Sequence, residues 1–234
     1  MNTVAMPEET TPTAALAPQT ADMIIPILEE KLKAYKLDVY VPHIPALAAF
    51  LEAFTAYNAN HNLTGETDLA RLIERHVVES LIIHSLLPKD AKTLADIGSG
   101  GGFPGAIIAC VGTPDTKIVL IESAQKKAAF LKEAMKSYPQ VTVLAERSNE
   151  VARKAEHKNH YDVVTLRAVT ELETSVDYAL PLLAPNGRIY LCKPKEDFEK
   201  SQISLSLIGV KLETYSEYTI EGRTRGIGIL RHPS

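Results

Sequence analysis

Five glycines fall within the eight residues 98–105, directly after a short apolar run that ends at Asp96 and Ile97. Glycine accepts positive φ angles and lets a ligand lie close to the backbone, but it weakens an element that needs neither property. Pro104 suits the first turn of a helix, where its missing N–H costs nothing. The segment therefore predicts a buried strand, a glycine turn and a helix start, and open α/β sheets bind ligands at such turns.

Three interpretations of this turn are open. The pattern Gly100-x-Gly102-x-x-Gly105 formally matches the fingerprint of dinucleotide-binding proteins. In that fingerprint the first glycine follows the strand directly, whereas here the acid Asp96 stands in the last turn of backbone before it. An acid two residues before Gly-x-Gly resembles the first motif of class I S-adenosylmethionine (SAM) methyltransferases. The third interpretation is a strand–helix turn without a ligand, which the number of glycines disfavours.

A second apolar run, from Lys117 to Glu122, also ends in an acid. In a doubly wound sheet, an acid at this place accepts hydrogen bonds from ribose hydroxyls. NAD and SAM both carry a ribose, so Glu122 indicates a nucleoside-like cofactor without distinguishing between the two. Its structural alternative is a solvated strand end.

The rest of the chain alternates between short apolar runs and amphipathic segments, which predicts parallel strands with crossover helices. Residues 1–20 are rich in Thr, Pro and Ala and are expected to be a disordered tail. Residues 21–90 are expected to form a helical subdomain that packs on the sheet domain of residues 91–234 and covers its pocket. We expect helices near 23–37, 43–60, 68–87, 104–111, 124–137, 148–156 and 171–183, strands near 93–97, 117–122, 141–145, 161–166 and 187–192, and a closing antiparallel pair at 210–217 and 224–230.

Composition narrows the class of protein. The net charge of −4 and the pI near 6 differ from the basic footprint of most nucleic-acid enzymes, although a local basic face is enough. Two cysteines make no disulfide framework, no Cys/His cluster has metal-ligand spacing, and no apolar run reaches membrane-span length. No Lys or Arg precedes Lys31, which argues against a secretory or transit peptide. We expect a cytoplasmic protein without a metal site or membrane contact.

Further sequence motifs, from about Asn58 to Lys193, occur in an order that resembles one family. These motifs are Asn58-Ala-Asn-His-Asn-Leu-Thr64, Arg75-His76, Glu79-Ser80-Leu81, Asp96-Ile-Gly-Ser-Gly-Gly-Gly-Phe-Pro-Gly105, Glu122-Ser123, Lys126-Lys-Ala-Ala-Phe-Leu131, Arg147, Leu166-Arg-Ala-Val169 and Cys192-Lys193. Together they are similar to the RsmG family (also called GidB, glucose-inhibited division protein B) of small-subunit ribosomal RNA guanine-N7 methyltransferases.

The resemblance implies a class I SAM-dependent methyltransferase, that is, an α/β Rossmann-like domain with a mostly parallel seven-stranded sheet and an N-terminal helical extension. It implies methyl transfer from SAM to N7 of a guanosine in 16S ribosomal RNA, by a monomer that acts on this RNA or on the small ribosomal subunit. N7 carries a lone pair and no proton, so we expect no catalytic acid or base. Two rival classes remain open: an NAD-dependent oxidoreductase, and a non-catalytic RNA-binding module of ribosome assembly.

The expected site residues follow from strand ends and from the resemblance. The residues expected to hold SAM are Asp96, Gly98, Gly100, Phe103, Glu122, Ser148, Asn149 and Arg167. The residues expected to contact RNA are Asn62, Arg147, Lys193, Arg223 and Arg225. We expect Arg147, Arg167 and Lys193 to converge on one rim, because they follow comparable strands.

Several assignments have an ordinary structural alternative. The ring of Phe103 would pack on the cofactor or plug the start of a helix. Arg167 would hold the methionine carboxylate or a phosphate through two hydrogen bonds, or form a structural ion pair. Asn62 would shape the base pocket or cap the preceding helix. His76 is expected to be a helix-to-sheet contact near the pocket and not a base.

The chain departs from the family pattern at Glu79, at Asn149, and after Lys193, where Pro194 stands in place of a small residue. The family usually has Asp where Glu79 stands, and it has an acid where Asn149 stands. Asn149 can still bond an adenine edge. Arg223 and Arg225 are expected to lie in a glycine-flanked turn at 222–226, on the rim of the pocket.

Overall fold

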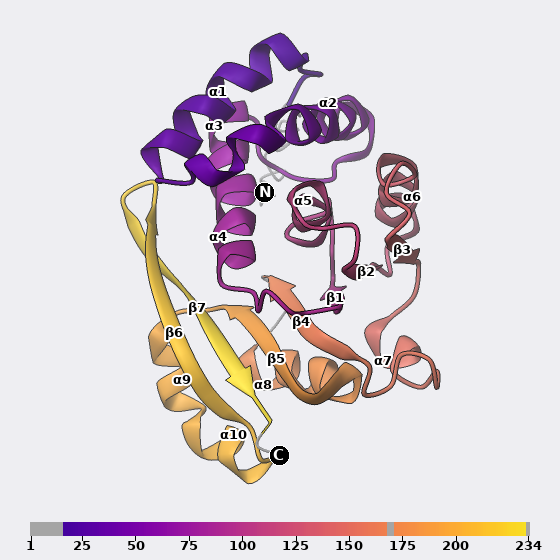
Figure 1. Ribbon diagram of the computed structural model, residues 1–234, viewed down its shortest axis with the longest axis vertical. Coiled ribbons are helices and arrows are strands. Elements are labelled where there is room, and N and C mark those ends of the chain that lie inside the picture. Colours follow the sequence, from indigo (N-terminus) through magenta and orange to yellow (C-terminus); the bar gives the residue numbers. More distant parts are fainter. Residues whose placement is uncertain (1–15, 168–170, 233–234) are drawn as a thin grey trace, which may run out of the picture.

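A seven-stranded sheet forms the centre of the computed structural model, which describes residues 16–167 and 171–232 (Figure 1). Its strand order is β3-β2-β1-β4-β5-β7-β6. The pairings are parallel apart from the two made by β7, which runs antiparallel to β5 and to β6. The strands are β1 (Thr93–Ile97), β2 (Lys117–Ile121), β3 (Val141–Leu144), β4 (Tyr161–Arg167), β5 (Leu183–Cys192), β6 (Lys211–Ile220) and β7 (Arg223–Arg231).

The central strands are apolar because helices cover both of their faces. In β1, for example, Leu94, Ala95 and Ile97 are each no more than 3% exposed. A strand that is buried on both faces reads as a continuous apolar run, which is the pattern seen in the sequence. The chain moves outward from β1 through β2 to β3, and then resumes on the other side of β1 at β4. Ligands of such sheets bind where the strand order reverses, at the carboxyl ends of β1 and β4.

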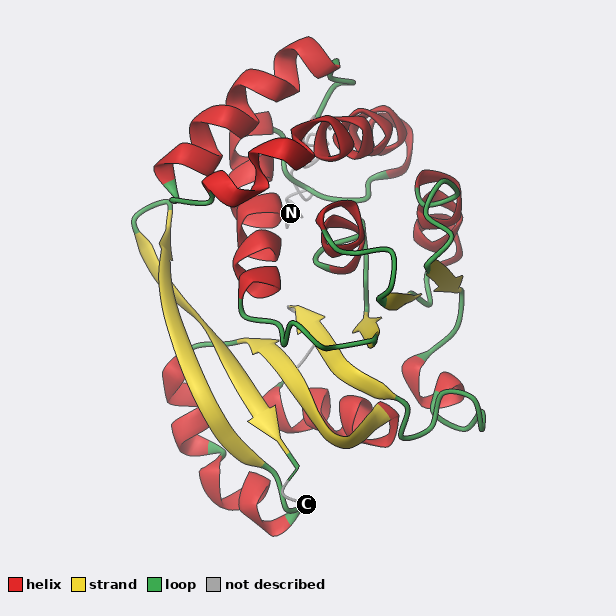
Figure 2. Ribbon diagram, in the orientation of Figure 1, coloured by secondary structure: helices red, strands yellow, loops and turns green. Residues whose placement is uncertain are grey.

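Helices form one layer on each side of the sheet (Figure 2). Two crossover helices, α5 (Gly105–Val111) and α6 (Gln125–Ala134), lie on the upper side in this view. The lower layer consists of α7 (Ser148–Val151), α8 (Leu172–Ala179) with the 3₁₀ turn η3 (Leu180–Leu182), α9 (Lys195–Lys200) and α10 (Gln202–Leu207).

The N-terminal helices extend the upper layer. They are α1 (Ala21–Ala34), the 3₁₀ helix η1 (Asp38–His43), α2 (Ile44–His61), α3 (Leu69–Leu72), the π-helix η2 (Ile73–Val78) and α4 (Glu79–Ser85). Phe50 and Phe54 of α2 pack against Phe103 and Phe130, and the ring centroids of Phe54 and Phe103 are 5.3 Å apart. These aromatic rings join the helical extension to the crossover layer in one hydrophobic core.

The long β6–β7 hairpin rises beside these helices, and an ion network fixes its tip near α1 and α3 (Figure 1). The carboxylate of Glu221 accepts hydrogen bonds from Nε of Arg71 at 3.0 Å and from Nε of Arg75 at 2.6 Å. The backbone N–H of Glu221 donates to Glu74 of η2 at 3.2 Å. The hairpin is thus tied to the helical extension as well as to β5.

The sheet confirms the expected strands, but three expectations about other segments were wrong and two helices were missed. Leu16 is 5% exposed and the N–H of Gln19 donates to Oγ1 of Thr55 at 3.0 Å, so residues 16–20 are packed and not a tail; residues 1–15 lie outside the described part. The helix expected at 148–156 ends at Val151. Residues 222–226 are mostly strand, because the turn lies at 221–222. The short helices α9 and α10 were not expected from the sequence.

One helical segment corrects the expectation about membrane-span length. Residues Asp38–His61 are long and apolar enough, by length and composition alone, to cross a membrane. In the fold, however, Leu47, Leu51 and Phe54 of this segment are completely buried in the core. Its hydropathy is explained by packing against α5 and α6.

Candidate functional site

The glycine turn lies between the carboxyl end of β1 and the start of α5. Gly98 and Gly100 have φ angles of 68° and 56°, which residues with a Cβ rarely adopt. A Cβ on Gly100 would meet only the carbonyl oxygen of Gly98, at 3.8 Å, so this side of the turn is open. A Cβ on Gly105 would instead lie 2.8 Å from Cβ of Asp96. The turn is packed against the strand on one side and free to receive a ligand on the other.

Asp96 lies beneath this turn and holds it in place. The residue is 1% exposed, and its two carboxylate oxygens accept hydrogen bonds from the N–H of Gly105 at 3.1 Å and from the hydroxyl of Thr165 at 2.7 Å. Burial raises the pKa of Asp96 to about 6, against the opposing effect of these hydrogen bonds. Asp96 therefore supports the turn from below, and its expected contact with the cofactor stays a prediction.

Glu122 ties the end of β2 to the same turn. One carboxylate oxygen accepts from the N–H of Gly100 at 2.8 Å and the other from the N–H of Ala124 at 2.7 Å. A carboxylate can accept about four hydrogen bonds. Glu122 thus retains acceptor capacity beside the glycine turn, where an acid that binds a ribose is expected.

A cleft opens over the turn at the carboxyl ends of β1, β2 and β3, and we call it the loop cleft. Three of its lining residues, Gly98, Ser148 and Asn149, belong to the expected cofactor set. Arg147 also lines it, so the three strand-end cations do not converge on one rim as expected. The complete lining consists of Ile97, Gly98, Ile121, Ser123, Glu146, Arg147, Ser148, Asn149 and Tyr178.

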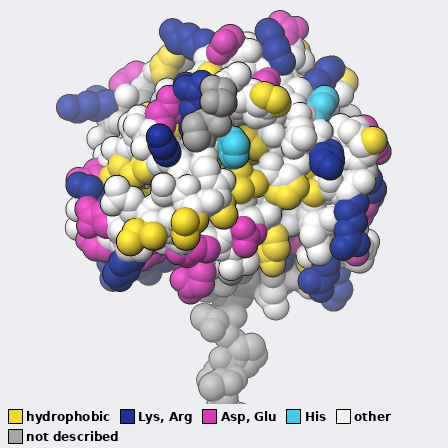
Figure 3. Space-filling model, turned by 90° about the horizontal axis from the view of Figure 1, so that it is seen from below, with side chains coloured by type: hydrophobic (Ala, Val, Ile, Leu, Met, Phe, Trp, Pro, Cys, Tyr) yellow, Lys and Arg dark blue, Asp and Glu magenta, His cyan; other side chains and the backbone are white. Residues whose placement is uncertain are grey.

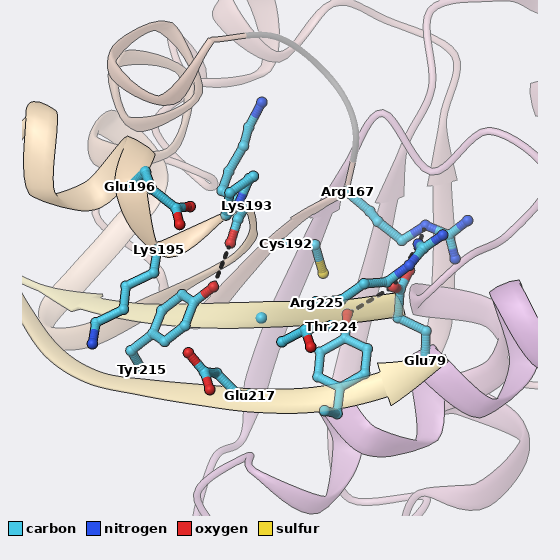
Figure 4. A pocket seen from close by; sticks show the side chains of 13 residues that line it. Glu79, Arg167, Cys192, Lys193, Lys195, Glu196, Tyr215, Glu217, Thr224 and Arg225 are labelled. Carbon is cyan, nitrogen blue, oxygen red and sulfur yellow. Dashed lines mark hydrogen bonds and ion pairs between the residues drawn. The ribbon is translucent and has the colours of Figure 1, made fainter. Parts of the chain in front are cut away.

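A second cleft, of about 370 Å³, opens at the carboxyl ends of β4 and β5 and is closed on its far side by β6 and β7 (Figure 4). We call it the β5–β7 cleft. It brings together Arg167, Lys193 and Arg225, three of the cations singled out from the sequence. Its lining is mixed in charge and consists of Glu79, Arg167, Cys192, Lys193, Pro194, Lys195, Glu196, Tyr215, Glu217, Tyr218, Thr224, Arg225 and Gly226.

Glu79 of α4 is the centre of a buried ion network in this cleft. One of its oxygens accepts from the hydroxyl of Tyr218 at 2.7 Å and from Nη1 of Arg225 at 3.2 Å, and the other lies 3.3 Å from Nε of Arg167. Glu79 is only 2% exposed, and burying a carboxylate is costly unless cations and hydrogen-bond donors are paired with it, as they are here. The structural ion pair that was the alternative for Arg167 is thus formed. The buried Nη1 of Arg167 has no hydrogen-bond partner among the described residues.

His76 links the π-helix η2 to the sheet. Its Nδ1 accepts a hydrogen bond from Nη2 of Arg167, and its ring stacks on Phe103 with centroids 5.0 Å apart. Burial, with a smaller contribution from the charge of Arg167, lowers the pKa of His76 to about 3. The expected helix-to-sheet contact is confirmed, and the nitrogen that faces Arg167 is occupied.

Besides Asp96, Gly100 and Glu122, three further expected site residues line neither cleft. Phe103 is 8% exposed and plugs the start of α5 within the aromatic cluster of α2, so its ring does not line the loop cleft. Asn62 has a φ of 49° and ends α2, with its N–H donating to the carbonyl of Asn58 at 3.2 Å. Arg223 is exposed at the start of β7, near the hairpin tip. Phe103 and Asn62 thus take their structural alternatives, and Arg223 lies too close to the hairpin tip to line the β5–β7 cleft.

Glu79, Tyr215 and Tyr218 line the β5–β7 cleft without having been expected there. Glu79 carried a detectable signal, because an acid on the buried face of a helix needs a partner. No sequence signal marked Tyr215 and Tyr218, because the edge strand β6 has several polar and aromatic residues and only its pairing with β7 shows which of them face the cleft.

Three groups of the β5–β7 cleft, Cys192, Tyr218 and Glu79, are not poised to act as a nucleophile or base. Burial raises the pKa of the Cys192 thiol to about 12, so it stays protonated near neutral pH. Burial likewise raises the pKa of Tyr218. Both oxygens of Glu79 are already paired. These three groups can orient a bound group but are not placed to remove a proton from it.

Comparison with known proteins gives the family. A model described as rRNA small subunit methyltransferase G matches residues 43–224. A protein of that name from Roseiflexus sp. (strain RS-1) is 33% identical over 195 residues, which cover 81% of this chain and 83% of that protein. The chain belongs to this family. Another member, from Gluconobacter oxydans (strain 621H), is 40% identical over 143 residues, 60% of this chain and 69% of its own.

Solved structures with similar folds include methyltransferases. An O-methyltransferase from Bacillus cereus in complex with SAH has a TM-score of 0.56 at 13% identity, over 79% of this chain and 90% of its own. TYW2 from P. horikoshii in complex with MeSAdo has a TM-score of 0.52 at 19% identity, over 67% and 62%. At these identities the likeness establishes the fold, which is that of a class I methyltransferase.

Membership in the rRNA small subunit methyltransferase G family argues against both alternatives, the NAD-dependent oxidoreductase and the non-catalytic RNA-binding module. The chain is an rRNA methyltransferase with SAM as its methyl donor. The formal dinucleotide match at Gly100, Gly102 and Gly105 is explained by the geometry of a strand–helix turn that both classes of cofactor site share.

Proposed function

We propose that this chain transfers a methyl group from SAM to N7 of a guanosine in 16S ribosomal RNA, acting as a cytoplasmic monomer on the small subunit. One observation carries the proposal: two clefts open at the carboxyl edge of the same sheet, one on each side of the place where the strand order reverses. The loop cleft suits a nucleoside cofactor, and the β5–β7 cleft, with its cations, suits a nucleotide of RNA.

The residues around the glycine turn fit SAM. Gly98 and Gly100 leave the backbone open, and Glu122 retains acceptor capacity for ribose hydroxyls. Asn149 lies in the loop cleft, where its amide can bond the adenine edge. The unpartnered Nη1 of Arg167 is the donor that the methionine carboxylate would satisfy. When bound, SAM supplies an electrophilic methyl group on a positively charged sulfur.

The chemistry of N7 matches what the β5–β7 cleft provides. Transfer to N7 would form the N7–methyl bond from the N7 lone pair as the methyl–sulfur bond breaks, with S-adenosylhomocysteine leaving, and no proton would have to be removed. The protonated thiol of Cys192 and the paired carboxylate of Glu79 agree with this chemistry. Rate enhancement then comes chiefly from alignment of the nucleophile with the methyl group. Because the guanine gains positive charge, Arg167 and Lys193 are assigned to carboxylate, phosphate or O6 contacts, away from N7 itself.

The target guanosine has to leave its stack to reach this cleft. Phosphate contacts hold such a nucleotide in register, and base contacts select it. We assign the phosphate contacts to Arg225 and Lys193, which lie at the rim formed by β7 and the end of β5. Arg147, in the loop cleft, is placed to contact the cofactor or an adjoining phosphate.

The direct test is methyl transfer by the purified protein. Small subunits from cells that lack this gene are incubated with isotopically labelled SAM, and the RNA is digested to nucleosides and analysed by mass spectrometry. The expected product is N7-methylguanosine from 16S RNA. A label on another base, on a ribose oxygen or on a pyrimidine carbon would overturn the proposed atom.

Two glycine variants control this test. Gly100→Val places a branched side chain at a φ of 56° in the open side of the turn, and it should abolish SAM binding by calorimetry while the domain stays folded. A Cβ on Gly65 would meet nothing within 4 Å, and this residue lies between α2 and α3 and not in the glycine turn, so Gly65→Val should bind SAM normally. Unchanged SAM affinity in Gly100→Val would contradict the cofactor site.

A further inference from the structure

One aromatic side chain in the β5–β7 cleft takes no part in the ion network around Glu79. Tyr215 projects from β6 into the cleft, beside Glu217 (Figure 4). Its hydroxyl donates to the carbonyl of Lys193 at 3.0 Å, which holds the far end of the ring against the end of β5. The residue is half-buried, so part of the ring stays accessible from the cleft.

The surroundings of Tyr215 fix the orientation of its ring. A Cβ on Gly226 would lie 2.0 Å from the hydroxyl oxygen and 2.1 Å from Cζ of Tyr215, so the ring rests directly on the backbone of β7. Phe198 of α9 packs against it edge-on, with centroids 5.6 Å apart and an interplanar angle of 65°. With the hydroxyl anchored as well, little rotational freedom is left for a ligand to restrict.

We propose that the ring of Tyr215 is the surface on which the target guanine stacks after it leaves the RNA stack. The inference rests on the proposed function and adds the residue that receives the base. Enzymes that act on extruded bases replace the lost stacking with aromatic or apolar side chains. A ring that is already immobilised loses little entropy on binding, which favours this use.

The charges beside the ring suit the edges of guanine. A carboxylate accepts from N1–H and the amino group, and a cation donates to O6. Glu217 on β6 and Lys193 after β5 line the same cleft as Tyr215 and offer these two chemistries. Stacking itself distinguishes bases poorly, so Tyr215 contributes affinity, while the polar groups contribute selection.

The test is a steady-state comparison of variants on small subunits from cells that lack this gene, with labelled SAM. Removing one stacked base contact weakens binding by about 5- to 150-fold, so Tyr215→Ala should raise KM for the subunit by about that factor. Because the contact serves ground state and transition state alike, kcat should change little. Tyr215→Phe keeps the ring and should stay close to wild type. SAM affinity by calorimetry should be unchanged in both.

Tyr57→Ala is the matched control. Tyr57 also donates its hydroxyl to a backbone carbonyl at 3.0 Å, that of Lys126, but it lies outside both clefts. Its removal should leave KM for the subunit unchanged. Tyr215→Leu keeps apolar bulk against Phe198 and provides a folded variant without a ring, should the alanine variant fail to fold; it should raise KM as well.

A second arm uses Gly226. Gly226→Ala introduces a Cβ that overlaps the Tyr215 ring and should raise KM by displacing it. In a Tyr215→Ala background the overlap is gone, so the same substitution should add little. Equal effects of Gly226→Ala in both backgrounds would overturn the inference.

The two proposals fail in different ways. If the wild-type protein transfers no methyl group to the subunit, the proposed function fails and the stacking role with it. If the wild-type protein is active and a folded Tyr215→Ala or Tyr215→Leu variant keeps its KM, only the stacking role fails. A Tyr215→Phe variant as impaired as Tyr215→Ala would also overturn it, because the hydroxyl bond and not the ring would then carry the effect.

Discussion

His76 is held neutral in the folded protein by burial and by the nearby charge of Arg167, which together lower its pKa to about 3. In the unfolded chain its pKa is 6.5. Between these values the unfolded chain binds a proton that the folded chain does not, so stability falls as the pH falls through this window. From about pH 7.5 to about pH 5, His76 should cost the folded state on the order of 2 kcal/mol.

Urea unfolding at the two pH values checks this loss against His76→Asn, whose amide oxygen can still accept from Arg167 but does not titrate. The wild type should lose more stability on acidification than the variant. The raised pKa of Asp96 acts in the opposite direction, because stability falls as the pH rises from 3.8 towards about 6, but it is present in both proteins and cancels. Equal losses in the two proteins would show that His76 is protonated in the fold.

The role of α2 extends beyond covering the sheet, because it supports the glycine turn. Phe54 is completely buried, and a Cβ on Gly101 would lie 2.5 Å from its ring. Phe54→Ala should destabilise the protein by about 3–5 kcal/mol, the usual range for a core phenylalanine. It should also weaken SAM binding, since the turn loses the surface on which it packs. Denaturant unfolding and calorimetry measure the two effects.

Phe198→Ala separates support of the turn from general loss of stability. Phe198 is 2% exposed and packs on the opposite side of the sheet, against Tyr215 and β7. It should cost a similar free energy of unfolding and spare the affinity for SAM at temperatures where both variants are folded. A Phe54→Ala variant that binds SAM like the wild type would refute the proposed support.

The parallel strands could be predicted from the sequence because a strand that is buried on both faces needs apolar residues at successive positions, as in 117–121 and 161–166. Two classes of element could not. α9 and α10 are six-residue helices whose buried apolar residues, Phe198 and Leu205, are too few to show a period. The packing of residues 16–20 depends on Thr55, a partner far away in sequence.

The candidate site was predictable only in its local part. The glycine turn and Glu122 act within one strand–turn–helix unit, so their spacing is visible in the sequence. Arg147 and Arg167 both follow strands, but β3 and β4 lie on opposite sides of β1 and β2, and this separates the two side chains into different clefts. The partners of Glu79 come from β4, β6 and β7, which only the tertiary fold brings together.

The whole molecule carries a net charge of −4, which has to be reconciled with an RNA substrate. On the lower face, acidic, basic and apolar side chains are interspersed without a field of one sign (Figure 3). Cations are instead gathered in the β5–β7 cleft, where Arg225 is balanced by Glu79. We therefore expect RNA binding to depend on a few local contacts and on the shape of the subunit more than on long-range attraction.

Arg225→Ala tests this local contribution. It should weaken binding to the small subunit, lower the slope of log affinity against log salt by about one unit, and leave SAM affinity unchanged. Arg188→Ala is the matched control, because Arg188 also pairs with a glutamate, Glu213, but stands outside both clefts. An Arg225→Ala variant with unchanged affinity and salt slope would rule out the phosphate contact.

The central claim is that this protein methylates N7 of a guanosine in 16S ribosomal RNA. The most direct measurement is a map of N7-methylguanosine along 16S RNA from cells with and without this gene, made by cleavage of the RNA chain at the modified base. We predict one guanosine position that is cleaved in RNA from the parent cells, is spared in RNA from cells without the gene, and is cleaved again when the wild-type protein, but not Gly100→Val, is restored. Identical cleavage maps from the two strains would contradict the claim.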